Sequence, residues 1–158
     1  MRHNIAPRTL VIVFVVTLVL STAATAQVVN PTCSLVRAAG TYGFSTSGTV
    51  IGVGPRVSEG TITLDAAGNV TNGKATSSLN GAITQEEFSG TYTVNSDCTG
   101  TATLAIRDLS GNLLLTVTLD SVWDDNMKQA RYIFTSATLP DGTSLLTVIS
   151  VDARKLVP

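Results

Sequence analysis

From about residue 40 onward, short runs of Thr, Ser and apolar residues alternate with turn sequences that carry Gly, Asn or Asp. Within most runs, apolar and polar positions alternate one by one, as Tyr42 and Phe44 do with Thr41 and Ser45. Such alternation places successive side chains on opposite faces of a strand, and short strands at this spacing are typical of an all-β sandwich or barrel. The pattern predicts eight strands, at residues 41–53, 57–65, 69–79, 83–94, 99–107, 112–123, 127–138 and 144–153.

Two of these strands depart from simple alternation. In the third, Val70 and Ala75 differ in parity, which predicts a β-bulge near Gly73. The eighth is apolar on both parities, so we expect it to be the most enclosed of the set.

The short turns favour an eight-stranded antiparallel meander barrel. An open meander would expose two strand edges, whereas closure into a barrel removes both. A β-sandwich is the alternative, but a Greek-key sandwich needs longer crossover connections than these turns provide. A barrel of eight strands has an interior just large enough for packed side chains or one small ligand.

The amino terminus has the pattern of a secretory signal peptide. Arg2 and Arg8 precede an apolar run at residues 10–20, and a small-residue cleavage site follows at residues 24–26. An apolar run of 11 residues is too short for a transmembrane helix, which needs roughly 20. We therefore expect a secreted protein, periplasmic or extracellular, with a signal peptide at 1–26, a lead-in segment at 27–40 and one barrel domain at 41–158.

Charge and the outer face of the strands exclude two classes of partner. Loss of Arg2 and Arg8 would leave eight basic residues against 11 acidic ones, a net charge of −3, with no basic stripe for nucleic acid. The outward positions are mainly Ser and Thr, whereas a transmembrane barrel needs an apolar outer band with aromatic girdles. The sequence thus predicts no nucleic-acid partner, and no membrane association after cleavage.

The only histidine, His3, lies within the predicted signal peptide. The processed protein could therefore build neither a Ser-His-Asp triad nor a His-liganded metal site. Asp120, Asp124 and Asp125 offer oxygen ligands for calcium, but their spacing does not match an EF-hand loop, and Asp-Asp-Asn is ordinary turn chemistry. We predict no metal and no cofactor.

Both cysteines, Cys33 and Cys98, follow the predicted cleavage site. Two exported cysteines without Cys-x-x-Cys spacing predict one intramolecular disulfide.

Four segments resemble a group of small secreted bacterial proteins whose barrels are similar to allene oxide cyclase and the wider calycin-like group. The resemblance spans about residues 33–153 and rests on turn-and-strand motifs. These are Cys33-Ser34-Leu35, Gly40-Thr41-Tyr42-Gly43-Phe44, Gly90-Thr91-Tyr92-Thr93-Val94 and Asp97-Cys98-Thr99-Gly100-Thr101. The resemblance implies a barrel fold; no residue matches the cyclase catalytic set, and a shared fold does not carry function.

The strand parities select the candidate site residues. All Tyr and Phe residues beyond the signal peptide share the apolar parity of their strands, either as core or as the lining of a cavity in which Tyr hydroxyls orient a guest. Glu86 shares that parity, so it either points inward, where burial suits a carboxylate to acid–base chemistry, or lies exposed at the strand mouth. The predicted lining residues are Tyr42, Phe44, Glu86, Phe88, Tyr92, Tyr132 and Phe134. Leu104 and Val117 should join them inside, while Thr91, Thr103, Thr116 and Arg131 should face solvent.

Three functions are compatible with this reading. The first is binding of a small apolar molecule in the barrel. A cyclase or isomerase acting in the same cavity is the second, and it requires an inward carboxylate. The third is a structural or surface-interaction module whose barrel is filled by side chains. The volume left inside the barrel separates the third from the other two.

Overall fold

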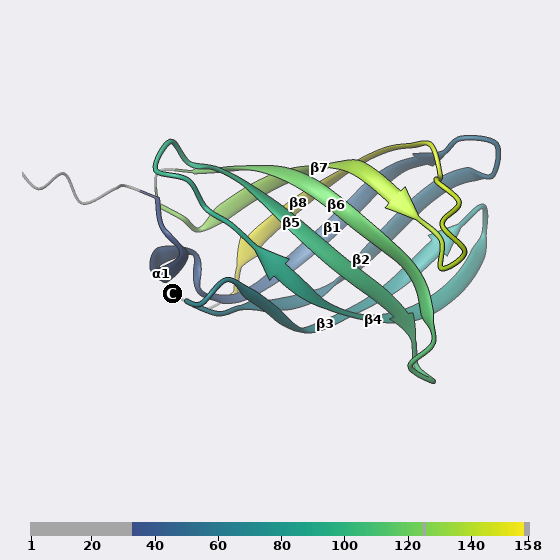
Figure 1. Cartoon of the computed structure of the whole chain (residues 1–158), viewed down its shortest axis with the longest axis horizontal. Helices are drawn as coiled ribbons and strands as arrows, with labels where there is room; N and C mark the ends of the chain where they lie inside the picture. Colours follow the sequence, from purple (N-terminus) through teal and green to yellow (C-terminus); the bar gives the residue numbers. More distant parts are fainter. Residues whose placement is uncertain (1–32, 125, 157–158) are drawn as a thin grey trace, which may run out of the picture.

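The structure, a computed structural model, describes residues 33–124 and 126–156, so the predicted signal peptide lies outside the described residues. Its strands are β1 (Gly40–Val50), β2 (Gly54–Leu64), β3 (Asn69–Leu79), β4 (Ala82–Tyr92), β5 (Thr99–Asp108), β6 (Leu113–Trp123), β7 (Gln129–Thr138) and β8 (Thr147–Lys155). Each strand pairs antiparallel with the next, and β8 pairs with β1 to close the barrel (Figure 1). The predicted eight-stranded meander barrel is confirmed.

The alternation of the sequence sets the two faces of the barrel wall. All nine residues predicted to lie inside the barrel, from Tyr42 on β1 to Phe134 on β7, line one cavity. Thr91, Thr103 and Arg131 are exposed as expected, while Thr116 points outward and is half-buried beside its neighbours on β5 and β7. The parity argument therefore holds on the five strands that carry these residues: β1, β4, β5, β6 and β7.

The predicted bulge in the third strand is confirmed. The register between β3 and β4 shifts between Val70 and Gly73, and Asn72 adopts a positive φ of 51°. A Cβ atom at Gly73 would collide with the ring of Phe88, so glycine makes room here for an aromatic side chain of the core.

The prediction for the eighth strand is wrong. Along β8, Ile149, Val151 and Ala153 are buried, but Val148 is 65% exposed, as is Leu146 (71%) just before the strand. The strand has one inner and one outer face like the others. Its outer apolar side chains therefore remain exposed to solvent.

The lead-in segment contains a helix that strand periodicity did not predict. Helix α1 (Leu35–Ala38) is one turn long, and the side chain of its N-cap residue Ser34 accepts a hydrogen bond from the Arg37 backbone N–H. The helix covers one end of the barrel (Figure 1). No helix within residues 33–124 and 126–156 has the length and apolar character needed to cross a membrane.

A disulfide joins this covering segment to the barrel. Cys33 and Cys98 are bonded, with their Cα atoms 5.1 Å apart, which confirms the predicted pairing. Cys33 is buried, and Cys98 lies in the turn between β4 and β5. A buried disulfide is compatible with an oxidising compartment.

Several turns are held by aspartates, as their sequences predict. Asp65 accepts hydrogen bonds from the backbone N–H groups of Ala67 and Asn69 and from the Asn69 side chain, and these bonds, led by the side-chain amide, lower the pKa of Asp65. Asp108 repeats the pattern with Asn112. Asp124 likewise accepts from the backbone of Lys128 and Gln129, so it is a turn residue.

Candidate functional site

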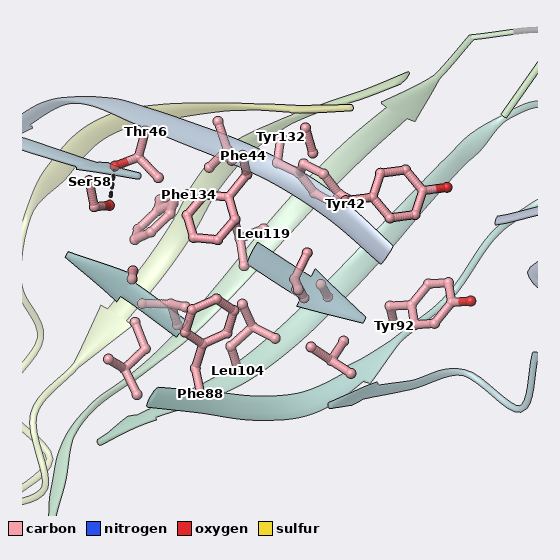
Figure 2. Close-up of a pocket in the computed structure, with 18 of the residues that line it drawn as sticks. Tyr42, Phe44, Thr46, Ser58, Phe88, Tyr92, Leu104, Leu119, Tyr132 and Phe134 are labelled. Atoms are coloured by element: carbon pink, nitrogen blue, oxygen red, sulfur yellow. Dashed lines mark hydrogen bonds between the residues drawn. The ribbon is translucent and has the colours of Figure 1, made fainter. Parts of the chain in front are cut away.

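The candidate site is a cavity of about 80 Å³ inside the barrel (Figure 2). All eight strands contribute to its wall, and the lining is mostly apolar. All seven residues predicted as lining are among the 21 that surround it. The lumen is therefore neither filled nor wide: about 80 Å³ accommodates a few water molecules or a small solute, whereas drug-sized ligands occupy roughly 300–1,000 Å³.

Aromatic rings form much of this wall. Phe44 and Phe88 meet edge to face with ring centroids 5.6 Å apart. Phe44 and Phe134 are both half-buried, although they point into the barrel, because they face the cavity. Edge-to-face contact is a favourable arrangement of aromatic pairs, so these rings form an ordered apolar surface.

Two tyrosine hydroxyls bond to backbone carbonyls of the protein itself, as expected if these side chains belong to the core, which was one of the two alternatives. Tyr42 Oη donates toward the carbonyl oxygens of Ala38 (2.7 Å) and Met127 (3.1 Å). Tyr92 Oη donates toward those of Asp65 (2.6 Å) and Leu35 (3.3 Å). Figure 2 shows both hydroxyls pointing the same way, toward the end of the barrel that α1 covers. These bonds hold that end of the barrel closed. The pKa of Tyr92 is raised to about 12, mainly by burial and secondly by the nearby negative charge of Asp65.

The third tyrosine differs from these two. Among the residues that the structure describes, none makes a hydrogen bond to the hydroxyl of Tyr132, and burial raises its pKa above the ordinary value. The indole of Trp123, which meets the rings of Tyr42 and Tyr132 edge to face, has a buried Nε1 without a partner among the described residues. The Tyr132 hydroxyl and the Trp123 indole N–H therefore have no hydrogen-bond partner among the described residues, and both lie beside the closed end of the barrel.

Glu86 points inward and is not exposed at the strand mouth, which decides between the two alternatives predicted for it. It is 5% exposed, and its Oε2 lies 2.8 Å from Arg56 Nη2 and 2.9 Å from Ser77 Oγ. Arg56 lies on β2 and Glu86 on β4, so the ion pair spans the intervening strand β3, which supplies Ser77. Because its carboxylate is already bound by the Arg56 cation and by the hydroxyls of Ser77 and Thr84, Glu86 is not a free base.

A second polar pair lies beside this one. Thr46 Oγ1 and Ser58 Oγ, on β1 and β2, are 2.6 Å apart and both buried (Figure 2). Arg56, Thr46, Ser58 and Ser77 were not predicted as site residues. The sequence does indicate that two of them point inward, because Arg56 and Ser58 share the parity of the apolar residues Ile62 and Leu64 on the same strand.

The end of the barrel opposite α1 is formed by the β1–β2, β3–β4, β5–β6 and β7–β8 connections (Figure 1). On β7, only residues Gln129 to Ile133 pair with β8. The segment 144–146 closes the gap beyond Ile133. Leu145 N–H donates a hydrogen bond to the Ala137 carbonyl, and the Leu146 carbonyl accepts one from Ile51 N–H. Exposed large apolar side chains occur at or next to each of these connections: Ile51, Val53, Ile83, Leu109, Leu146 and Val148.

No metal cluster is present in the part of the chain that the structure describes. No group of three or more His, Cys, Asp or Glu side chains there is placed to hold an ion. Asp120 is exposed and Asp124 caps its turn.

Comparison with solved structures finds designed barrels. A redesigned β-barrel, mFAP1, bound to DFHBI, superposes with a TM-score of 0.51 at 14% identity, covering 77% of this chain and 98% of that one. EF1p2_mFAP2b bound to DFHBI gives 0.53 at 10% identity, covering 75% and 94%. No protein-family model and no curated protein matches the chain. These neighbours support the barrel fold that the sequence resemblance implied; they do not bear on allene oxide cyclases or on a bacterial secreted origin.

Proposed function

We propose that this protein is a secreted barrel that binds a small, mainly apolar molecule in its lumen. The observation that carries the proposal is the cavity of about 80 Å³, walled by apolar side chains from every strand. A barrel that serves only as a rigid module gains stability from filling this space, because each unfilled volume forfeits packing contacts. The similarity to the redesigned barrels does not support ligand binding by this chain, because at 14% and 10% identity it extends to the fold alone.

The cavity volume restricts the guest. A molecule of a few non-hydrogen atoms fits without rearrangement, and a larger one requires Phe44 and Phe134 to rotate away from the lumen. Because α1 covers one end, we expect access at the other, where the segment 144–146 bridges the gap between β7 and β8.

Secretion is the second part of the proposal. The signal-peptide pattern of residues 1–26 and the Cys33–Cys98 disulfide both support it. Amino-terminal sequencing of the exported protein should give Gln27 first. A product that retains the apolar run at residues 10–20 would contradict this part and leave the binding proposal standing.

The binding proposal is tested by methyl NMR titration with short n-alkanes and 2-alkanones. Saturable shifts should appear at the lumen methyls of Leu104, Ile106 and Val117 and be absent from the exposed methyls of Ile83. Leu104→Trp should abolish the shifts by filling the cavity. Thr103→Trp, on the outer face of the same strand, is the matched control and should bind as the original protein does. Shifts at exposed methyls alone would contradict lumen binding.

A further inference from the structure

The lumen is not uniform around the barrel wall: different strands contribute side chains of different polarity. Apart from the tyrosines, its polar lining residues come from β1, β2 and β4: Thr46, Arg56, Ser58 and Glu86. The wall from β5–β7 is mostly apolar and includes Leu104, Val117 and Phe134, with Tyr132 as its one hydroxyl-bearing lining residue. A molecule in this cavity therefore meets charged and hydroxyl groups on one side and a mostly apolar wall on the other.

Arg56 has donors to spare. Its hydrogen bonds to Ser77 and Glu86 both come from Nη2, whereas a guanidinium carries five N–H groups. Among the described residues, none accepts from its Nε or Nη1. The Arg56 side chain is only 11% exposed and forms part of the cavity wall.

The hydroxyl pair supplies one more donor. Thr46 and Ser58 share a single hydrogen bond at 2.6 Å, which uses one of their two hydroxyl protons. The other hydroxyl proton has no acceptor among the residues described, and both side chains border the cavity. One unused hydroxyl proton therefore joins the unused N–H groups of Arg56 at this side of the lumen.

The charges at this position are balanced. Glu86 offsets the positive charge of Arg56 at 2.8 Å, so the site has no net charge to attract an ion. A carboxylate guest would bring a second negative charge beside Glu86, and an ammonium a second positive charge beside Arg56. In an apolar cavity either one is costly, because the added charge loses its water without gaining a counter-ion.

We propose that Arg56 and Glu86, with Thr46 and Ser58, form a head-group subsite that takes an uncharged hydrogen-bond acceptor, such as a ketone, ester or amide carbonyl, of a small amphiphile. The inference rests on the proposed lumen binding and adds the class of ligand: a neutral molecule with one acceptor and an apolar body. The apolar body would lie against Phe44, Phe88 and Phe134, and the acceptor would face the free N–H groups of Arg56.

The test is calorimetric titration with n-alkanes, 2-alkanones, n-alkanoates and n-alkylamines of matched chain length. The 2-alkanone should bind about tenfold more tightly than the alkane, the value of one well-made hydrogen bond to a charged donor. The alkanoate and the alkylamine should bind more weakly than the 2-alkanone, also by about tenfold or more. Equal binding of alkane and 2-alkanone, or tighter binding of the alkanoate, would overturn the subsite while lumen binding stands. Failure of every probe would overturn both.

Two variants sharpen the test. Glu86→Gln keeps the shape of the side chain but leaves Arg56 without its counter-ion, so the preference should change from the 2-alkanone to the alkanoate. Glu87→Gln, at the neighbouring exposed position, is the matched control and should leave the order of affinities unchanged. An unchanged order in Glu86→Gln would contradict the proposal.

The double variant Arg56→Met with Glu86→Leu removes both charges and guards against misfolding of the single variant. It should still bind the alkane and should lose the preference for the 2-alkanone. A preference that survives in this variant would assign recognition of the acceptor to other groups and overturn the inference.

Discussion

The hydroxyl of Tyr42 on β1 lies 2.7 Å from the carbonyl oxygen of Ala38, the last residue of α1. The same side chain lines the cavity and fixes the helix that closes one end of it. Tyr42 therefore joins the closure of the barrel to the wall of the candidate site.

Tyr42→Phe should lower the free energy of unfolding by about 1–2 kcal/mol, because it leaves the buried carbonyls of Ala38 and Met127 without this donor. Tyr132→Phe is the matched control: it removes a hydroxyl that has no partner among the described residues, and stability should change by less than about 0.5 kcal/mol. Urea unfolding of both variants measures this. Equal losses would contradict the assignment of the Tyr42 hydroxyl as a closing bond.

Replacing both cysteines by alanine should reduce stability by about 4 kcal/mol in the chain-entropy description of a disulfide. The bridge spans 65 residues of sequence and ties the segment before α1 to the turn after β4. Far-ultraviolet circular dichroism should still report β structure, because neither cysteine lies in a strand and none of the eight strand pairings includes one. An unchanged urea midpoint would contradict a stabilising role.

Arg56→Met should destabilise the barrel by about 3 kcal/mol, because it leaves the buried Glu86 carboxylate uncompensated. Adding Glu86→Leu should recover most of that loss, since apolar pairs replace buried ion pairs well. Lys74→Ala breaks the exposed pair with Glu87, which lies at 3.7 Å, and should cost less than about 1 kcal/mol. If the single and double changes at the buried pair cost the same, the two charges are not coupled.

Stability should fall in alkaline solution. Tyrosine titrates at 10.0 without perturbation, whereas Tyr92 in the folded barrel titrates at about 12, and burial raises the pKa of Tyr42 and Tyr132 as well. The folded state holds these protons more tightly, so the stabilisation is complete below pH 10.0 and is lost as pH rises through the folded-state values. Urea unfolding at a series of pH values, with tyrosinate absorbance followed in parallel, measures this. A free energy of unfolding that stays constant up to pH 12 would contradict it.

Much of the fold could be predicted because alternation is a physical constraint on strands. Residues on one parity of β6, such as Val117 and Leu119, are buried, and the predicted bounds of β3 match those observed. The prediction for β8 was wrong because a strand that is apolar on both parities carries no signal of which face is inside. Helix α1 has four residues, too few to show a helical period.

The aromatic part of the site could be predicted from parity alone, but its polar part could not. Parity places Arg56 and Glu86 on inner faces without saying that they meet. Their contact depends on the register of β2, β3 and β4, including the shifts at Thr61/Thr63 and Val70/Gly73. The roles of the Tyr42 and Tyr92 hydroxyls depend on loop backbone and on α1, which strand patterns do not describe.

Crystals of the protein under xenon pressure test the central claim most directly. Xenon enters dry apolar cavities and reports their position without relying on any chosen ligand chemistry. The account predicts a xenon site inside the barrel, among Leu104, Val117 and Phe134. Xenon found only at the protein surface would show that the lumen admits no apolar guest and would contradict the account.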